Sequence, residues 1–245
     1  MSGPIRIAMW SGPRNLSTAM MRSFGARADC AVLDEPFYAV YLALTGIHHP
    51  MREEVLAAQS TDPAEVACAL LGPAPGGRAI WYQKHMPHHM VTGVPRDWFK
   101  ACRHAVLIRA PERVAASFDA GRPDPTPEDL GAPQMDGVVA DIESATGRTP
   151  PVIEAEDVRA NPAGMLRALC AALEIPFDPA MLSWSPGLRE SDGVWAAHWY
   201  ASVIASGGFA PPPEAEPTLR PALARAAAAA RPAFERLQAR KLRPI

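Results

Sequence analysis

Short runs of apolar residues recur along the chain, and turn residues bound each run. Between the runs lie longer segments in which the apolar residues return at helical spacing. Short apolar runs of this kind are typical of strands that are buried on both faces. The pattern predicts five strands, at Ile5–Trp10, Cys30–Leu33, Ala79–Gln83, Ala105–Ile108 and Val152–Glu154.

Several of the intervening segments carry proline where a helix would begin. Proline is favoured there because the first helical turn does not need its backbone N–H. Helices are expected to begin near Ser17, Pro36, Pro63, Arg96, Pro111, Met135 and Asn161. Strands that alternate with helices build βαβ units, so the sequence predicts an α/β fold with a central, mainly parallel sheet flanked by helices on both faces.

A chain of 245 residues can form one such domain with a full core. We therefore expect a single α/β domain over residues 1–245, with a C-terminal helical extension at about 214–245. Within the extension, Thr218–Leu242 is rich in Ala and Arg and is expected to be a helix that packs on the domain; the alternatives are a contact in a homodimer or a flexible basic tail. Gly121–Pro133 is rich in Gly, Pro and Asp and predicts a mobile loop or lid.

The composition excludes several classes of protein. The formal net charge is −2, so there is no excess of positive charge to attract nucleic acid. The four cysteines form no C-x-x-C pair, which argues against a zinc ribbon and against a disulfide framework. No stretch is long enough to span a bilayer, and the N-terminus lacks the pattern of a signal peptide. We expect a cytoplasmic protein that binds neither nucleic acid nor a membrane.

The loop after the first predicted strand carries groups that bind anions. It contains Gly12, Arg14 and Asn15 and leads into a helix that begins with Ser17 and Thr18. A helix N-terminus presents unpaired N–H groups and the positive end of the helix dipole, while the hydroxyls and the guanidinium add side-chain donors. We predict a phosphate or sulfate site here; the alternative is a plain turn with a Ser or Asn cap. A Walker A motif would need Gly-Lys before the Ser/Thr, and this loop has none.

Charged residues also follow the other predicted strands. Glu35 follows the second strand, Lys84 and His85 follow the third, and Arg109 follows the fourth. Ligands of parallel sheets bind outside the carboxyl ends of the strands. We therefore expect these side chains to meet at one rim of the sheet.

A second anion site is predicted around Arg109. Arg113 and Ser117 are spaced four residues apart on the helix that follows, so they lie on the same face. One phosphate can then contact the strand-end guanidinium and the Ser117 hydroxyl together. The alternative is a surface arginine beside a helix cap.

The two anion sites resemble those of the sulfotransferases that use 3′-phosphoadenosine 5′-phosphosulfate (PAPS). In that family a P-loop-like segment, Pro-Lys-Ser-Gly-Thr-Thr, follows a strand and binds the 5′-phosphosulfate. Pro13–Thr18 stands in its place, with Arg14 for the lysine and Leu16 for the glycine. A later strand of the family ends in an arginine with a serine eight positions on, and this pair holds the 3′-phosphate. Arg109 and Ser117 have that spacing.

Three further segments are similar to family elements and follow in the same order. They are His85–Pro87, which resembles a His-Leu-Pro element, Leu173–Leu182, which resembles a Leu-Gly-Ile-Pro-Phe-Asp-Pro segment, and Arg189–Trp199. The last resembles the late element that closes over the 3′-phosphate, which assigns Arg189 to the donor site. The resemblance runs from Ile5 to Trp199 and implies a three-layer, P-loop-like fold.

The resemblance implies a sulfotransferase that moves a sulfuryl group from PAPS to a hydroxyl or amine of a small-molecule acceptor. Transfer would be in line, and catalysis would consist of positioning and charge stabilisation with no metal required. Arg14, assisted by Ser17, Thr18 and Lys84, would hold the bridging and leaving oxygens. The sequence does not identify the acceptor.

Two residues are candidates for the base that takes the acceptor's proton. His85 corresponds to the catalytic histidine of the cytosolic branch, and its ordinary pKa suits the task. Glu35 corresponds to a glutamate that other branches reach from a Glu-Pro element, and burial or the adjacent Asp34 can raise its pKa. Alternatively, Glu35 pairs with Arg14 and His85 is a satisfied histidine at the rim.

Other functions stay open at this point. In a P-loop phosphotransferase, Asp34 would bind magnesium, although the missing Gly-Lys argues against it. A non-catalytic nucleotide-binding relative is the third hypothesis. His85, His88 and His89 lie close together in sequence, but no glutamate accompanies them in a zincin pattern, so no metal site is predicted.

Overall fold

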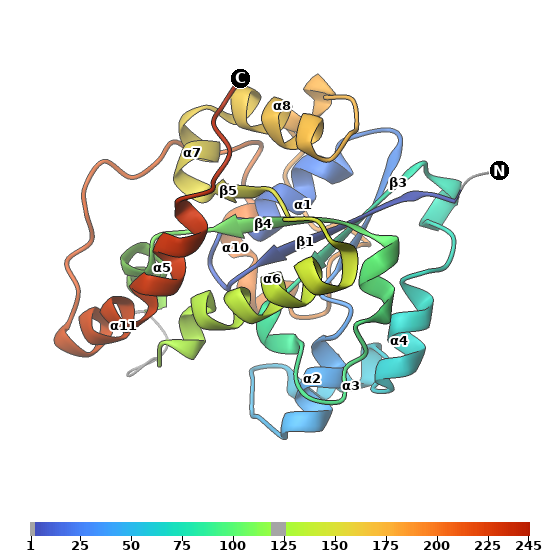
Figure 1. Ribbon diagram of the computed structural model, residues 1–245, viewed down its shortest axis with the longest axis horizontal. Coiled ribbons are helices and arrows are strands. Elements are labelled where there is room, and N and C mark those ends of the chain that lie inside the picture. Colours follow the sequence, from blue (N-terminus) through green and yellow to red (C-terminus); the bar gives the residue numbers. More distant parts are fainter. Residues whose placement is uncertain (1–2, 119–125) are drawn as a thin grey trace.

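The computed structural model describes residues 3–118 and 126–245. Its centre is one sheet of five parallel strands in the order β2-β3-β1-β4-β5 (Figure 1). The strands are β1 (Ile5–Ser11), β2 (Cys30–Asp34), β3 (Ile80–His85), β4 (Arg103–Ile108) and β5 (Val152–Glu154). All five predicted strands are present, and the α/β fold with a parallel sheet is confirmed.

Helices connect the strands and cover the sheet. The α-helices are α1 (Ser17–Gly25), α2 (Tyr38–Thr45), α3 (Arg52–Ala58), α4 (Pro63–Ala69), α5 (Pro111–Phe118), α6 (Ala132–Thr146), α7 (Ala155–Ala160), α8 (Pro162–Ala172), α9 (Ala196–Trp199), α10 (Ala201–Ile204) and α11 (Pro221–Gln238). The 3₁₀ helices are η1 (Pro75–Gly77), η2 (Pro87–His89), η3 (Asp97–Ala101), η4 (Glu128–Leu130) and η5 (Pro179–Leu182).

Two predicted segments differ in detail from the structure. The helix expected near Arg96 is the short 3₁₀ helix η3, in which Trp98 Nε1 donates to the carbonyl oxygen of Pro95 at 3.0 Å. Of the predicted loop Gly121–Pro133, residues 121–125 lie outside the described residues. Its remainder contains η4 and the first residues of α6.

The strands are apolar on both faces because both faces are covered. In β1, Ile7 and Met9 belong to a core with α1 and α8, whereas Ala8 and Trp10 belong to a second core with α4 and α6. This alternation has period two, as the pleat of a strand requires. Consecutive residues at a strand end therefore point to opposite layers.

The C-terminal helix α11 is packed against the domain. It lies on α5 and α6, and its Phe234 and Leu237 enter the second core although Pro232 interrupts its hydrogen bonding (Figure 1). Beyond α11, the Leu242 N–H donates to the carbonyl oxygen of Val152 at 2.7 Å, so the chain continues beside β5. In the described ranges, no helix combines the length and apolar character that a membrane crossing requires.

Two buried tyrosines provide a test of the core. Among the residues that the structure describes, the Tyr82 hydroxyl has no hydrogen-bond partner, whereas the Tyr200 hydroxyl donates to Asp34 Oδ2 at 2.7 Å. Tyr82→Phe is expected to leave the free energy of unfolding unchanged or raise it by about 1 kcal/mol, since it removes an unpaired polar group. The matched change Tyr200→Phe should lower it by about 1–3 kcal/mol. Urea unfolding measures both, and equal losses would contradict the prediction.

Candidate functional site

The loop between β1 and α1 is held in an unusual backbone conformation. Arg14 has a φ of 60° and Leu16 a φ of 73°, in the left-handed region that favours glycine. Within the described part of the chain, the N-terminus of α1 has no side-chain cap. The capped turn is therefore not what forms here, and the first-turn N–H groups of α1 lack a side-chain acceptor.

The other predicted residues of this loop shape it or flank it. A Cβ at Gly12 would lie 3.1 Å from the carbonyl oxygen of Leu130, so glycine permits η4 to approach the loop. Asn15 is buried, and its amide lies 3.4 Å from the carbonyl oxygen of Leu107 on β4. Ser17 and Thr18 occupy the first turn of α1.

Arginines gather beside this loop around the partly buried carboxylate of Glu156. Arg109, at the end of β4, donates from Nη1 to the carbonyl oxygen of Arg14 at 3.0 Å and from Nε to Glu156 Oε1 at 2.9 Å. Arg113 Nε lies 3.9 Å from the same carboxylate oxygen. Burial, followed by the charges of Arg109 and Arg113, lowers the pKa of Arg159. Burial and the Arg109 charge likewise lower the pKa of Arg14, so the four guanidinium groups share one positive field.

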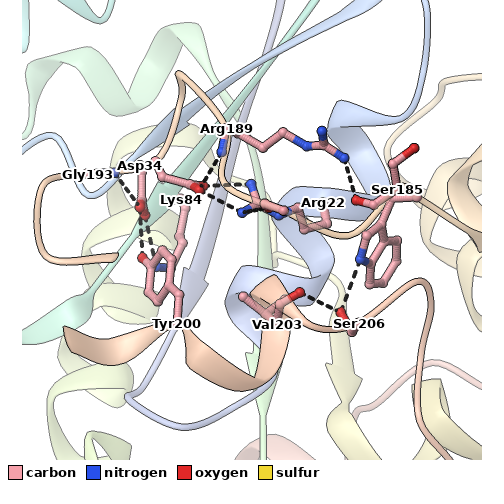
Figure 2. A network of polar contacts seen from close by, with 12 residues as sticks. Arg22, Asp34, Lys84, Ser185, Arg189, Gly193, Tyr200, Val203 and Ser206 are labelled. Atoms are coloured by element: carbon pink, nitrogen blue, oxygen red, sulfur yellow. Dashed lines mark hydrogen bonds and ion pairs between the residues drawn. The ribbon is translucent and has the colours of Figure 1, made fainter. Parts of the chain in front are cut away.

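Ser117 and Arg189 make local contacts. Ser117 lies on α5 one turn beyond Arg113, and its hydroxyl donates to the carbonyl oxygen of Val114 at 2.8 Å. The Arg189 N–H donates to Asp192 Oδ2 at 2.8 Å, and its guanidinium donates to the carbonyl oxygen of Ser185 at 2.6 Å (Figure 2). Asp192 in turn binds both Nη atoms of Arg22 on α1, at 2.6 and 2.7 Å.

A buried charge cluster lies at the ends of β2 and β3. Lys84 Nζ donates to Asp34 Oδ1 at 2.9 Å, to Glu35 Oε1 at 2.7 Å and to the Tyr200 hydroxyl at 2.6 Å. All three of its N–H groups are thereby used. Asp34 Oδ2 accepts two further hydrogen bonds, from the Tyr200 hydroxyl at 2.7 Å and from the Gly193 N–H at 3.2 Å (Figure 2).

Burial and charge set the protonation of this cluster. Burial alone would lower the pKa of Lys84, but the charges of Asp34 and Glu35 outweigh it and hold that pKa well above its usual value. For Glu35, burial raises the pKa and the Asp34 charge adds to it, while Lys84 opposes both. A carboxylate whose pKa is raised above its ordinary value takes up a proton more readily than an ordinary glutamate does.

His85 points to the opposite layer, although it is adjacent to Lys84 in sequence. Its ring stacks on Trp10 and Trp98, with centroids 4.8 and 4.9 Å away, and its Nε2 lies 3.4 Å from Gln83 Oε1. Burial, assisted by His104, lowers the pKa of His85 to about 3. The period of the strand thus separates the two candidate bases, Glu35 and His85, into different layers.

Backbone strain coincides with this rim. Glu35 has a φ of 40°, and with Arg14 and Leu16 it is one of three non-glycine residues with positive φ that directly follow β1 or β2. Such conformations cost about 1–3 kcal/mol each and persist where the surroundings require them. The strained residues are those that carry the charged side chains or connect them to α1.

Some residues of the site were not predicted. Glu156 and Arg159 lie on α7 directly after β5, so the rule that ligands bind at strand ends would have found them had it been applied to the fifth strand.

Three aromatic residues near the C-terminal part of the fold differ in exposure. Trp199 is partly exposed, whereas Trp195 and Tyr200 are buried, and the Trp195 Nε1 donates to the Tyr200 hydroxyl at 3.0 Å.

A cavity of about 400 Å³ lies between α2, η2 and α6. Its lining residues are Tyr41, Pro87, His88, Met90, Val91, Arg96, Gln134, Gly137, Val138 and Asp141. Its size is in the range of small-molecule pockets. No cluster of three or more His, Cys, Asp or Glu side chains arranged to hold a metal ion occurs among residues 3–118 and 126–245.

Comparison with known proteins relates this geometry to a family. Among curated proteins, the chain is 38% identical over 212 residues to branched-chain-amino-acid aminotransferase-like protein 1 of Arabidopsis thaliana, and 36% identical over 206 residues to protein 2 of that name. These matches cover 86% and 84% of this chain. They cover only 38% and 36% of the relatives, so the chain spans little more than a third of their length.

Two solved structures share the fold. A sulfotransferase from Alicyclobacillus acidocaldarius superposes with a TM-score of 0.54 at 14% identity, covering 98% of this chain and 96% of that one. A sulfotransferase domain from the curacin biosynthetic pathway gives a TM-score of 0.50 at 15% identity, covering 93% and 98%. The sequence profile described as "Sulfotransferase domain" matches residues 5–241. The chain, whose anion loop and arginines suggested this resemblance, therefore belongs to the sulfotransferase family.

Proposed function

We propose that the protein transfers a sulfuryl group from PAPS to a hydroxyl or amine of a small acceptor. The observation that carries this proposal is the group of arginines beside the uncapped N-terminus of α1. Arg109, Arg113 and Arg159 lie around Glu156, and Arg14 lies next to Arg109. Four guanidinium groups against two carboxylates, the partly buried Glu156 and the exposed Glu216, leave an excess of positive charge that favours a ligand with several negative charges. PAPS carries two phosphate groups and a sulfate, and supplies the sulfuryl group.

The two ends of the donor are assigned to the two anion sites. We assign the 5′-phosphosulfate to Arg14, Ser17 and Thr18, where helix N–H groups and a guanidinium can stabilise the charge of the leaving oxygen. The 3′-phosphate is assigned to Arg109 and Ser117. Because Arg109 already donates to the backbone of Arg14, the two sites are mechanically linked.

Arg189 is assigned to the 3′-phosphate by its sequence resemblance. In the structure its guanidinium donates to the carbonyl oxygen of Ser185, so it must release this contact to reach a phosphate. Asp192, which also binds Arg22, would hold the backbone of Arg189 in place while the Arg189 side chain moves to the phosphate.

The contacts of Asp34 argue against the phosphotransferase hypothesis. A magnesium ligand of the Walker B kind needs a carboxylate oxygen that is open to the ion or to its waters. Asp34 Oδ1 is bound by Lys84, and Oδ2 is bound by Tyr200 and Gly193. Asp34 thus has a positioning role, and it keeps Lys84 charged beside Glu35.

We propose Glu35 as the base, in preference to His85. Glu35 lies at the sheet rim next to Lys84, and its Oε2 atom is not used by that contact. Lys84 stabilises the ionised form of Glu35, whereas His85 has a strongly lowered pKa and is enclosed by aromatic rings. In this arrangement Lys84 stabilises the ionised form of Glu35, and its bonds to Asp34 and Glu35 connect the ends of β2 and β3.

Binding of adenosine 3′,5′-bisphosphate (PAP) tests the donor site. Arg109→Ala is expected to weaken its affinity by about ten- to a hundredfold, because a charge-assisted hydrogen bond contributes about 1.5–3 kcal/mol. The control Arg148→Ala removes an exposed arginine that pairs with Glu174 and should leave the affinity unchanged. Isothermal titration calorimetry without metal measures both variants.

The same titration separates the competing functions. Magnesium-dependent binding of ATP, with no response to the bisphosphate, would support a phosphotransferase and overturn the proposal. Binding of the bisphosphate without turnover of PAPS would identify a non-catalytic relative. An Arg14→Ala variant that binds the bisphosphate but loses turnover would identify an enzyme.

The pH dependence of turnover distinguishes the two candidate bases. A base acts only when deprotonated, so the rate should fall as the pH decreases through the pKa of Glu35, which lies above the ordinary glutamate value. If His85 were the base, the rate would hold down to about pH 3, the pKa of that residue. The measurement is kcat/KM for release of PAP from PAPS as a function of pH.

Substitution of the base completes this test. Glu35→Gln is expected to reduce the rate by about 10²- to 10⁴-fold, the contribution typical of a general base, while PAP still binds. Glu53→Gln, on an exposed carboxylate of α3, is the matched control and should have no effect. A Glu35→Gln variant with the wild-type rate would exclude Glu35 as the base.

A further inference from the structure

One buried polar atom next to Glu35 has no role in the mechanism so far. His89 is 2% exposed, and its Nε2 atom has no hydrogen-bond partner among the described residues. This nitrogen lies 3.9 Å from Glu35 Oε2. Buried polar atoms are nearly always satisfied, so an unpartnered one in a reactive site indicates a missing ligand or water.

The ring of His89 is held in place and cannot turn away easily. It lies between Tyr38 and Tyr41, with ring centroids 4.9 and 5.0 Å away and interplanar angles of 10° and 28°. His88 meets the ring edge-on at 4.5 Å, and the backbone N–H of His89 donates to the carbonyl oxygen of Met86. Nε2 is therefore directed at Glu35 by packing and not by a hydrogen bond to it.

The spacing of the two groups leaves a place for one atom. Glu35 Oε1 is bound to Lys84, whereas Oε2 accepts no hydrogen bond from the residues placed in the structure. A separation of 3.9 Å is too long for a direct bond. It fits an oxygen atom that lies about 2.8 Å from both groups.

We propose that His89 Nε2 and Glu35 Oε2 together hold the nucleophilic oxygen of an acceptor hydroxyl. The imidazole N–H donates to that oxygen, and the hydroxyl donates to Glu35. The second lone pair of the oxygen then attacks sulfur. As the oxygen–sulfur bond forms, the bond from sulfur to the 5′-phosphate oxygen breaks, its electron pair leaves with PAP, and the proton passes to Glu35 Oε2.

This arrangement favours a hydroxyl over an amine. An ionised carboxylate disfavours a nitrogen lone pair that faces it, so the tautomer with hydrogen on Nε2 is stabilised. Burial, followed by the charges of His88 and His49, lowers the pKa of His89 well below its usual value, so the ring donates while neutral. A hydroxyl has the matching set of one proton and a free acceptor lone pair.

The cavity next to His89 has room for the remainder of the acceptor. Tyr41 and His88 line it, and both also contact the His89 ring. The cavity is thus one side chain away from the His89 ring. A small hydroxylated molecule seated there would approach Glu35 along the edge of the His89 ring.

Hydrolysis of PAPS tests the role of His89 without knowledge of the acceptor, because water can take the place of the hydroxyl. His89→Phe keeps an aromatic ring for the stack but removes the donor, and is expected to slow PAP release by about tenfold or more, the effect of one lost hydrogen bond to the reacting atom. His89→Gln keeps an N–H donor and should retain most of the rate. His48→Phe, on an exposed histidine, is the control.

The inference rests on the proposed function, and the readouts separate the two. Wild-type protein that does not bind PAP overturns the sulfotransferase proposal itself. Normal PAP binding in every variant, with PAPS hydrolysed by His89→Phe at the wild-type rate, overturns only the role of His89. A crystal structure with PAP decides independently of the rate: an oxygen atom within reach of both His89 Nε2 and Glu35 Oε2 supports the proposal, and a direct bond between them overturns it.

Discussion

The ammonium group of Lys84, buried between two carboxylates and a phenol, is the constraint on which the rest of the site depends. A buried cation is stable only when its hydrogen bonds and charge are fully met, and here Asp34, Glu35 and Tyr200 meet them. Removing Lys84 would leave two buried carboxylates without a counter-charge, and removing Tyr200 would leave Lys84 and Asp34 each without one hydrogen-bond partner. The cluster thereby fixes where β2 ends relative to β3, and where the segment around Tyr200 returns to the sheet.

A buried ion pair of this kind contributes more to the arrangement of a site than to net stability, since desolvation offsets most of the attraction. Its consequence is chemical. Lys84 binds one oxygen of Glu35 and leaves the other without a hydrogen bond to Lys84, and the backbone of Glu35 is held in the left-handed region directly after β2. The neighbouring anion loop is also held in a left-handed conformation. Its residue Leu16 is the N-cap of α1, and no side chain in the described part of the chain caps that helix. Strain and buried charge are concentrated at the strand ends, while the apolar layers on both faces hold them in place.

Much of this architecture follows from the sequence. Apolar runs marked all five strands, and the strand-end rule found Arg14, Glu35, Lys84 and Arg109, because a parallel sheet brings its carboxyl ends to one rim. That rule does not tell on which face of the sheet each strand-end side chain lies. The predicted third strand ended at Gln83, whereas β3 continues to His85, and this extension puts the side chains of Lys84 and His85 on opposite faces of the sheet. The partners of Lys84 and Arg109 from α7 and from the segment around Tyr200 are long-range contacts, and no local pattern encodes them.

The link between Tyr200 and Asp34 also bears on how the protein folds. The two residues are 166 positions apart, and Arg22 and Asp192 are separated by 170. Closing loops of this length is entropically costly, and contacts of this kind form slowly compared with local ones. On the ribosome, β1 to β4 can pair before residue 200 has been made. Lys84 then lacks the hydrogen bond to the Tyr200 hydroxyl, and Asp34 lacks those from Tyr200 and Gly193. This rim of the sheet is consequently among the last parts of the molecule to form, after the strands that carry it.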